Sequence, residues 1–219
     1  MKRSIGIRLV VFCLCFSRAL AASPQEEHLD KDWVNQGQQY IVTKEYQKAI
    51  DLFTKVITDN PEESVAYNKR GITHMILRQW DQAIQDFTKA IEINPQFFGA
   101  YNNLGIAYSG IKQFDQAIKV YTKSIEINPQ NANAYHNRAN AYSKLNEKER
   151  AIQDYTKAIE INPQYANAYY QRGNTYEQLN QKEKAIESYR LFIKYADPNI
   201  RGKDIEAIKE RILFLSDGK

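Results

Sequence analysis

The feature that most constrains this chain is a phrase that it repeats at a fixed interval. DQAIQDFTKAIEINP begins at Asp81, DQAIKVYTKSIEINP at Asp115 and ERAIQDYTKAIEINP at Glu149. The prolines that close these phrases and an earlier, more divergent one lie 34 residues apart, at Pro61, Pro95, Pro129 and Pro163. Self-similarity at such a period indicates a stacked array, because each unit buries its apolar face against the next one.

Within each copy, aromatic and small residues recur at helical spacing. Residues at steps of three and four share one face of a helix, and a small residue there lets a second helix approach closely. The spacing predicts two antiparallel helices per copy, and an Asn-Pro dipeptide ends the second, because proline cannot continue the hydrogen-bond ladder. Copy by copy, the positions are Trp33, Gly37, Tyr40, Ala49 and Phe53; Tyr67, Gly71, His74, Ala83 and Phe87; Tyr101, Gly105, Tyr108, Ala117 and Tyr121; Tyr135, Ala139, Tyr142, Ala151 and Tyr155; and Tyr169, Gly173, Tyr176, Ala185 and Tyr189.

This pattern resembles the tetratricopeptide repeat, whose signature is W-x2-L-G-x2-Y, then A-x3-F, then P. The resemblance implies an all-α fold, a right-handed superhelical solenoid of about five helix-turn-helix repeats with a C-terminal capping helix. The family leucine is kept only at Leu104; the other copies have Gln36, Arg70, Arg138 and Arg172. The expected repeat bounds are 30–63, 64–97, 98–131, 132–165 and 166–199.

Both ends of the chain differ from the array. Residues 22–29 form a short polar lead, and the fifth copy has Asp197 where the proline is expected, with Pro198 one residue late. Residues 200–219 contain an apolar stripe at helical spacing, Ile205, Ile208, Ile212 and Leu215. Because a stack of repeats leaves a bare apolar face at its end, this segment is predicted to be the capping helix.

Residues 1–21 have the layout of a secretory signal peptide. Basic residues precede the apolar run from Leu9 to Phe16, and Ala19-Leu20-Ala21 supplies a cleavage site. A run of this length is too short to span a bilayer, which takes about 20 residues. We therefore expect export to the periplasm or secretion, without stable membrane insertion after cleavage. The absence of Asn-x-Ser/Thr acceptors slightly favours a bacterial source and the periplasm.

Loss of that segment also changes the charge of the protein. The whole chain has 30 basic and 26 acidic residues, and four of the basic ones, Lys2, Arg3, Arg8 and Arg18, lie before the cleavage site. The mature chain is then formally neutral, since 30 − 4 equals 26. A neutral balance does not favour nucleic acid as a partner.

No arrangement of residues points to an enzyme. The histidines His28, His74 and His136 have no metal-binding spacing, and the chain has neither a G-x-S-x-G nor a Gly-rich phosphate loop. Both cysteines, Cys13 and Cys15, lie in the predicted signal peptide. The sequence therefore predicts a non-enzymatic protein without a metal or other cofactor.

The family resemblance implies that first helices line a concave face and hold extended peptides. Amides dominate the positions one, two and five residues after each opening aromatic. Amide side chains carry a donor and an acceptor, so a row of them can pair with successive peptide groups. The predicted peptide-binding residues are Asn35, Asn68, Lys69, Asn102, Asn103, His136, Asn137, Asn140, Tyr170, Gln171 and Asn174.

This row resembles the asparagine ladder in the helical-repeat arm of O-linked N-acetylglucosamine transferase, although the amides could equally be solvated surface residues. The carboxylate clamp of cochaperone repeats is a poor match, because Asn68 and Asn102 stand where its lysine is expected and Lys69 is isolated. Three functions stay open: an exported adaptor that binds an extended segment of a protein, a self-assembly module that stacks through a repeat end or a convex surface including Tyr165 and Tyr170, and a docking subunit of an envelope or cell-wall enzyme complex.

Overall fold

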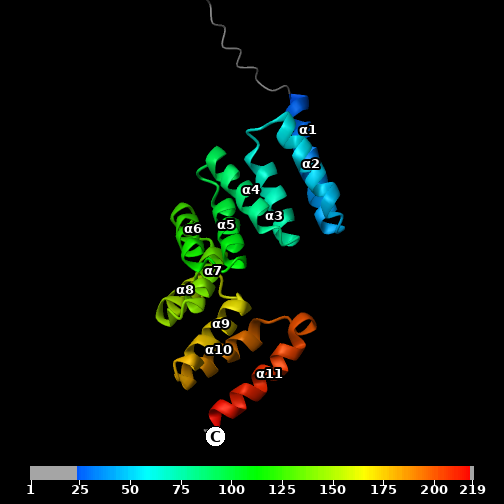
Figure 1. Cartoon of the computed structure of the whole chain (residues 1–219). Coiled ribbons are helices and arrows are strands. Elements are labelled where there is room, and N and C mark those ends of the chain that lie inside the picture. Colours follow the sequence, from blue (N-terminus) through cyan, green and yellow to red (C-terminus); the bar gives the residue numbers. More distant parts are fainter. Residues whose placement is uncertain (1–23, 218–219) are drawn as a thin grey trace, which may run out of the picture.

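The computed structural model describes residues 24–217, so the predicted signal peptide lies outside the described residues. Within that range the fold is all-α, as predicted, and eleven helices follow one another without a strand (Figure 1). Five helical hairpins are followed by a single C-terminal helix. The helices are α1 Pro24–Val42, α2 Tyr46–Asp59, α3 Ser64–Ile76, α4 Trp80–Ile93, α5 Phe98–Gly110, α6 Phe114–Ile127, α7 Ala132–Lys144, α8 Lys148–Ile161, α9 Ala166–Gln178, α10 Lys182–Tyr195 and α11 Pro198–Ser216.

The hairpins stack into an open, curved array with α1 and α11 at its two ends (Figure 1). We call α1, α3, α5, α7 and α9 the first helices and their hairpin partners the second helices. Each first helix contacts the first helix of the next repeat, whereas no two second helices of the described chain are in contact. Because the first helices crowd together and the second helices spread apart, the first helices form the inner, concave face.

The core of each repeat is an aromatic ring from the second helix packed on a small residue of the first. Tyr121 is 2% exposed, and a Cβ built on Gly105 would lie 2.4 Å from its Cε1 atom. At Gly105 an added Cβ would collide with this ring, so the glycine allows the close approach that the sequence spacing predicted. The same arrangement brings Gly37, Gly71 and Gly173 against Phe53, Phe87 and Tyr189.

Two kinds of turn keep the spacing constant. Between repeats, the second helix ends at an asparagine whose side chain caps the turn; the Oδ1 atom of Asn94, for example, accepts a hydrogen bond from the Gln96 amide at 3.1 Å. Within each hairpin, one residue of the turn has a left-handed backbone conformation, which L-residues rarely adopt. These residues are Lys44, Arg78, Lys112, Asn146 and Asn180, with φ between 56° and 63°.

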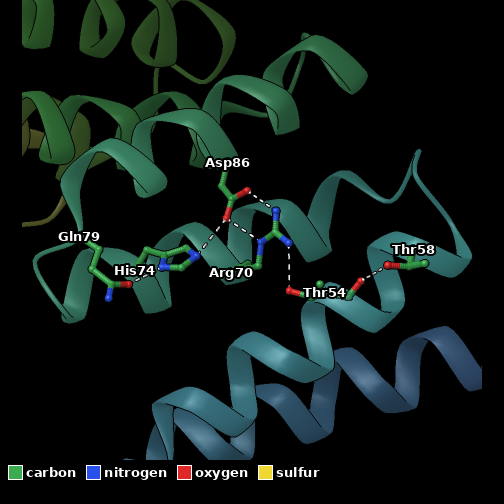
Figure 2. Close-up of polar contacts among 6 residues, drawn as sticks. All are labelled: Thr54, Thr58, Arg70, His74, Gln79 and Asp86. Atoms are coloured by element: carbon green, nitrogen blue, oxygen red, sulfur yellow. Dashed lines mark hydrogen bonds and ion pairs between the residues drawn. The ribbon is translucent and has the colours of Figure 1, made fainter.

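The arginines that replace the family leucine bridge two repeats. The Arg70 guanidinium donates from Nε and Nη2 to the Asp86 carboxylate at 2.9 and 2.7 Å, and from Nη1 to the Thr54 hydroxyl of the preceding repeat at 3.0 Å (Figure 2). His74 lies on the other side of Asp86, with its Nε2 atom 3.9 Å from the carboxylate. Arg138 repeats the arrangement with Asp154 and Thr122.

The helices at the two ends of the array, α1 and α11, begin earlier than the sequence predicted. Helix α1 starts at Pro24, within the segment taken as a polar lead, because proline suits the first helical turn and the residues that follow favour helix. Helix α11 starts at Pro198 because Asp197 caps it, accepting from the Asn199 amide at 2.8 Å, and it bends at Arg201.

Helix α11 closes the core of the last repeat. Ile205, Ile208 and Leu215 are each 7% exposed and pack with Tyr189 and Phe192, and Ile212 joins them partly buried. Its side chains also reach the last first helix one period back, at Asn167 from Arg201 and at Glu177 from Arg211, each 34 residues away. The helix thus occupies the place of the first helix of a sixth repeat, and it caps the array as predicted.

Candidate functional site

The candidate site is the concave surface formed by successive first helices. The structure places all the predicted peptide-binding residues on these helices, but it uses them in different ways. Asn35 on α1 is exposed and has no hydrogen-bond partner among the described residues. The other members lie partly buried or buried at the seams between neighbouring helices.

Four of the predicted asparagines form two matched pairs across the helix seams. The Asn103 side chain on α5 donates from Nδ2 to the Asn68 Oδ1 atom on α3 at 2.9 Å. One repeat further along, Asn137 on α7 donates in the same way to Asn102 on α5 at 3.1 Å. The row is therefore linked from helix to helix rather than composed of separate amides.

Each of these pairs leaves one donor and one acceptor unused. The Nδ2 groups of Asn68 and Asn102 and the Oδ1 atoms of Asn103 and Asn137 make no hydrogen bond within the described chain. All four atoms are accessible to solvent. Within residues 24–217, the side-chain nitrogen or oxygen that is both buried and without a hydrogen-bond partner is Nδ1 of His136, not one of these four. A peptide group carries the complementary acceptor and donor.

The other predicted residues hold the remaining seams. Lys69 on α3 donates from Nζ to the Gln38 Oε1 atom on α1 at 2.6 Å. His136 on α7 is 8% exposed and packs against Tyr165, the residue before α9, with the ring centroids 4.9 Å apart and the rings tilted by 37°. Burial lowers the pKa of His136 to about 4, so the ring is neutral at ordinary pH.

Asn140 and Asn174 pair with buried tyrosines of their own repeats. The Tyr155 hydroxyl donates to Asn140 Oδ1 at 2.7 Å, and the Tyr189 hydroxyl lies at the same distance from Asn174 Oδ1. Burial raises the pKa of both tyrosines, and for Tyr189 the nearby Glu177 carboxylate adds to the effect. The sequence carried only part of this signal. Both repeats with asparagine at this position have a core tyrosine, but the third repeat has Ile106 there with Tyr121, whose hydroxyl lies 3.4 Å from the Ser109 hydroxyl instead.

A polar cavity of about 500 Å³ lies between α7 and α9. Three of the predicted residues line it, Asn140, Gln171 and Asn174. The other lining residues were not predicted: four lie eight or nine residues after the opening aromatic of their repeat, one lies six residues after it, and one is the buried tyrosine of the fourth repeat. These residues are Ser143, Lys144, Tyr155, Thr175, Glu177 and Gln178.

The polarity of one position on the first helices changes along the array. At the ninth position after the opening aromatic, the first two repeats have Val42 and Ile76, which are 67% and 43% exposed. The third repeat has Gly110, and the last two have Lys144 and Gln178. At this position, the first helices carry apolar side chains in the first two repeats and polar ones in the last two.

The two tyrosines expected on the convex surface lie instead at the start of α9, a first helix. The Tyr165 hydroxyl donates to Asn133 Oδ1 on α7 at 2.8 Å. Tyr170 packs against Phe192 with 5.3 Å between ring centroids. Both rings are partly buried between helices of the last repeats.

Membrane crossing and metal binding each need a particular arrangement of the described residues. They contain no helix that is both long enough and apolar enough to cross a bilayer. Residues 24–217 also bring together no group of three or more histidine, cysteine, aspartate or glutamate side chains that could hold a metal ion.

Comparison with known protein families gives tetratricopeptide-repeat matches over much of the chain. A model described as tetratricopeptide repeat matches residues 64–97 and 132–165, and a second with the same description matches 87–119 and 154–187. A model described as TPR repeat matches residues 111–146. Comparison with curated proteins gives no match.

Among solved structures, the chain is similar to MamA, with 26% identity over 73% of this chain and 93% of MamA and a TM-score of 0.67. It is also similar to YrrB, described as a TPR protein with an unusual peptide-binding site, at 20% identity, with 74% and 84% of the two chains covered and a TM-score of 0.61. The PilF protein of Pseudomonas aeruginosa matches at 13% identity over 86% of this chain and 89% of that one, with a TM-score of 0.74.

Proposed function

Because this chain is built from tetratricopeptide repeats, we propose that it is a non-enzymatic scaffold that binds an extended segment of a partner protein along its concave face. The observation that carries the proposal is the pair of amide bridges, Asn68 to Asn103 and Asn102 to Asn137. Each bridge fixes the orientation of two side chains and leaves one donor and one acceptor unused.

An extended backbone fits these unused groups in chemistry and in spacing. Packed helices lie about 8–10 Å apart, and an extended chain advances about 3.3 Å per residue, so neighbouring bridges would meet peptide groups about three residues apart. Hydrogen bonding to the backbone is largely independent of sequence, so specificity must come from other parts of the groove. YrrB, a structural relative described as having a peptide-binding site, supports the same class of ligand.

The compartment is part of the proposal. The basic and apolar segment before Ala22 favours export to the periplasm or secretion, where the partner would be an exported or envelope protein. The amide bridges themselves contain no ionisable group, so binding through them does not depend on the pH of that compartment.

The test uses a neutral, fluorescently labelled peptide of about ten residues of serine, threonine, alanine and glutamine, long enough to span several first helices. Replacing Asn103 and Asn137 together by alanine should weaken its binding about tenfold, since each substitution removes one acceptor, worth about 0.5–1.5 kcal/mol. Fluorescence anisotropy gives the dissociation constants.

The matched control replaces Gln116 and Gln153 by alanine. These are exposed amides on the second helices α6 and α8, outside the concave face. Circular dichroism melts establish that both variants are folded. Equal binding by the wild-type protein and the N103A/N137A variant would contradict the proposal.

A further inference from the structure

The cavity between α7 and α9 has an uneven supply of hydrogen-bonding groups. Several acceptors that line it are already used inside the protein. Asn140 Oδ1 accepts from Tyr155 at 2.7 Å, and Gln171 Oε1 accepts from Asn174 at 3.4 Å.

The one carboxylate of the cavity is also engaged. Glu177 Oε2 lies 2.8 Å from the Tyr189 hydroxyl, whose single proton it shares with Asn174 Oδ1, and Glu177 Oε1 pairs with Arg211 of α11. The hydrogen bond from Arg211 lowers the pKa of Glu177, so the group is ionised and its charge is balanced. Glu177 therefore adds little net charge to the cavity.

The groups that stay without a partner are mainly donors. Lys144 is exposed in the last turn of α7, and no acidic side chain of the described chain forms an ion pair with it. The Ser143 hydroxyl and the Nε2 group of Gln171 make no hydrogen bond within the same residues. Lys148 adds a second cation nearby, where its Nζ donates to the Gln178 carbonyl at 3.4 Å.

Lys144 lies at the C-terminus of α7, where free backbone carbonyls would repel an anion. Several of these carbonyls are hydrogen-bonded, which weakens the repulsion. The Ala141 and Ser143 carbonyls accept from the backbone amides of Leu145 and Asn146 at 3.2 and 3.1 Å. These bonds satisfy carbonyls that would otherwise concentrate negative charge at the C-terminus of the helix.

We propose that this cavity binds a carboxylate of the partner segment, with Lys144 as its cation and Ser143 and Gln171 as hydrogen-bond donors. The inference rests on the proposed function, because the carboxylate is carried by the same extended segment that follows the amide bridges. The amide bridges bind the peptide backbone and do not distinguish between sequences. A carboxylate site would require an acidic group in the ligand. The carboxylate comes from an aspartate or glutamate side chain or from the C-terminus of the segment.

The test compares four forms of the neutral peptide probe: the peptide with a blocked C-terminus, the same peptide with one internal glutamate, its glutamine counterpart, and a form with a free C-terminal carboxylate. We expect the glutamate or the free C-terminus to tighten binding about threefold to tenfold, as a charge-assisted contact at a partly exposed site does. The peptide whose binding is tighter than that of the blocked neutral peptide identifies the source of the carboxylate, a side chain or the C-terminus.

The variants then locate the effect. Lys144→Gln should remove the gain, so that this variant binds the glutamate and glutamine peptides equally, whereas Lys119→Gln, at an exposed lysine on α6, should retain the gain. Equal binding of all four peptides to the wild-type protein, or a gain that survives in K144Q, would overturn the carboxylate site and leave the groove proposal standing. Failure of every peptide to bind would overturn both.

Discussion

At the scale of single residues, His136 combines burial with an unsatisfied atom. The ring is enclosed by Tyr155 and Tyr165, and its Nε2 atom lies 3.1 Å from the Asn140 amide, while Nδ1 has no partner. A charged imidazole there would lose hydration without gaining an anion, which is why burial lowers its pKa. Protonation of His136 should therefore weaken the seam between the fourth and fifth repeats.

This residue predicts a pH dependence of stability. The pKa of His136 falls from 6.5 in the unfolded chain to about 4 in the folded one, so between these values the unfolded chain binds a proton that the folded protein does not. The free energy of unfolding should then fall as the pH decreases from 6.5 to 4, by up to about 3 kcal/mol.

The measurement is urea denaturation at a series of pH values, for the wild-type protein and for His136→Asn. The variant should lose less stability than the wild type over this window. The two proteins should show parallel curves above pH 7, where the imidazole is neutral in both states. Parallel curves down to pH 4 would contradict the prediction.

At the scale of the helical elements, two positions 16 residues apart vary together between repeats. The second and fourth repeats have an ion pair there, Arg70 with Asp86 and Arg138 with Asp154, and both carboxylates are nearly buried. The third repeat has Leu104 and Val120 instead. The fifth repeat places Arg172 opposite Ser188, so an arginine is tolerated there without a carboxylate. A nearly buried aspartate without its arginine, in contrast, would be a charge without a partner.

Arg138→Leu alone should therefore destabilise the protein by about 3–5 kcal/mol, since it leaves Asp154 uncompensated. The double variant R138L/D154V copies the third repeat and should recover most of that loss. Chemical denaturation of the wild type, both single variants and the double variant completes the cycle. A double variant whose loss equals the sum of the two single losses would refute the coupling.

Some contacts between the helices follow from the sequence, and others do not. The glycine and aromatic positions were predictable, because tight packing of Gly105 on Tyr121 leaves a strict spacing. The coupling of Arg70 to Asp86 was open to prediction from the joint change at the two positions of the third repeat. The bridge from Asn68 to Asn103 was not, because it depends on how far each helix is rotated against the next, which the spacing of residues does not specify.

At the scale of the whole molecule, the array has only neighbouring contacts, so its stability is distributed unevenly. Each hairpin packs on the next, and α11 touches the last repeat alone. In such a chain, stability is close to a sum of repeat terms and interface terms, and a change at one end is felt mainly there.

Ile208→Ala, on the buried face of α11, should cost about 2–5 kcal/mol in the last repeat. Amide hydrogen exchange should accelerate most in α9, α10 and α11 and least in α1 and α2. A matched change on the same helix, Glu206→Ala at an exposed position, should leave exchange nearly unchanged. Uniform acceleration from α1 to α11 would show that the array unfolds as one unit.

The contacts of α11 also determine which repeat could be duplicated without detaching this helix from the array. Arg201 and Arg211 each reach a partner 34 residues earlier, Asn167 and Glu177. A second copy of residues 166–199 inserted ahead of α11 would bring both partners with it, whereas the fourth repeat offers Ser143 where Glu177 is needed. Duplication of the final unit is therefore the change that lengthens the binding surface and keeps the closing helix attached.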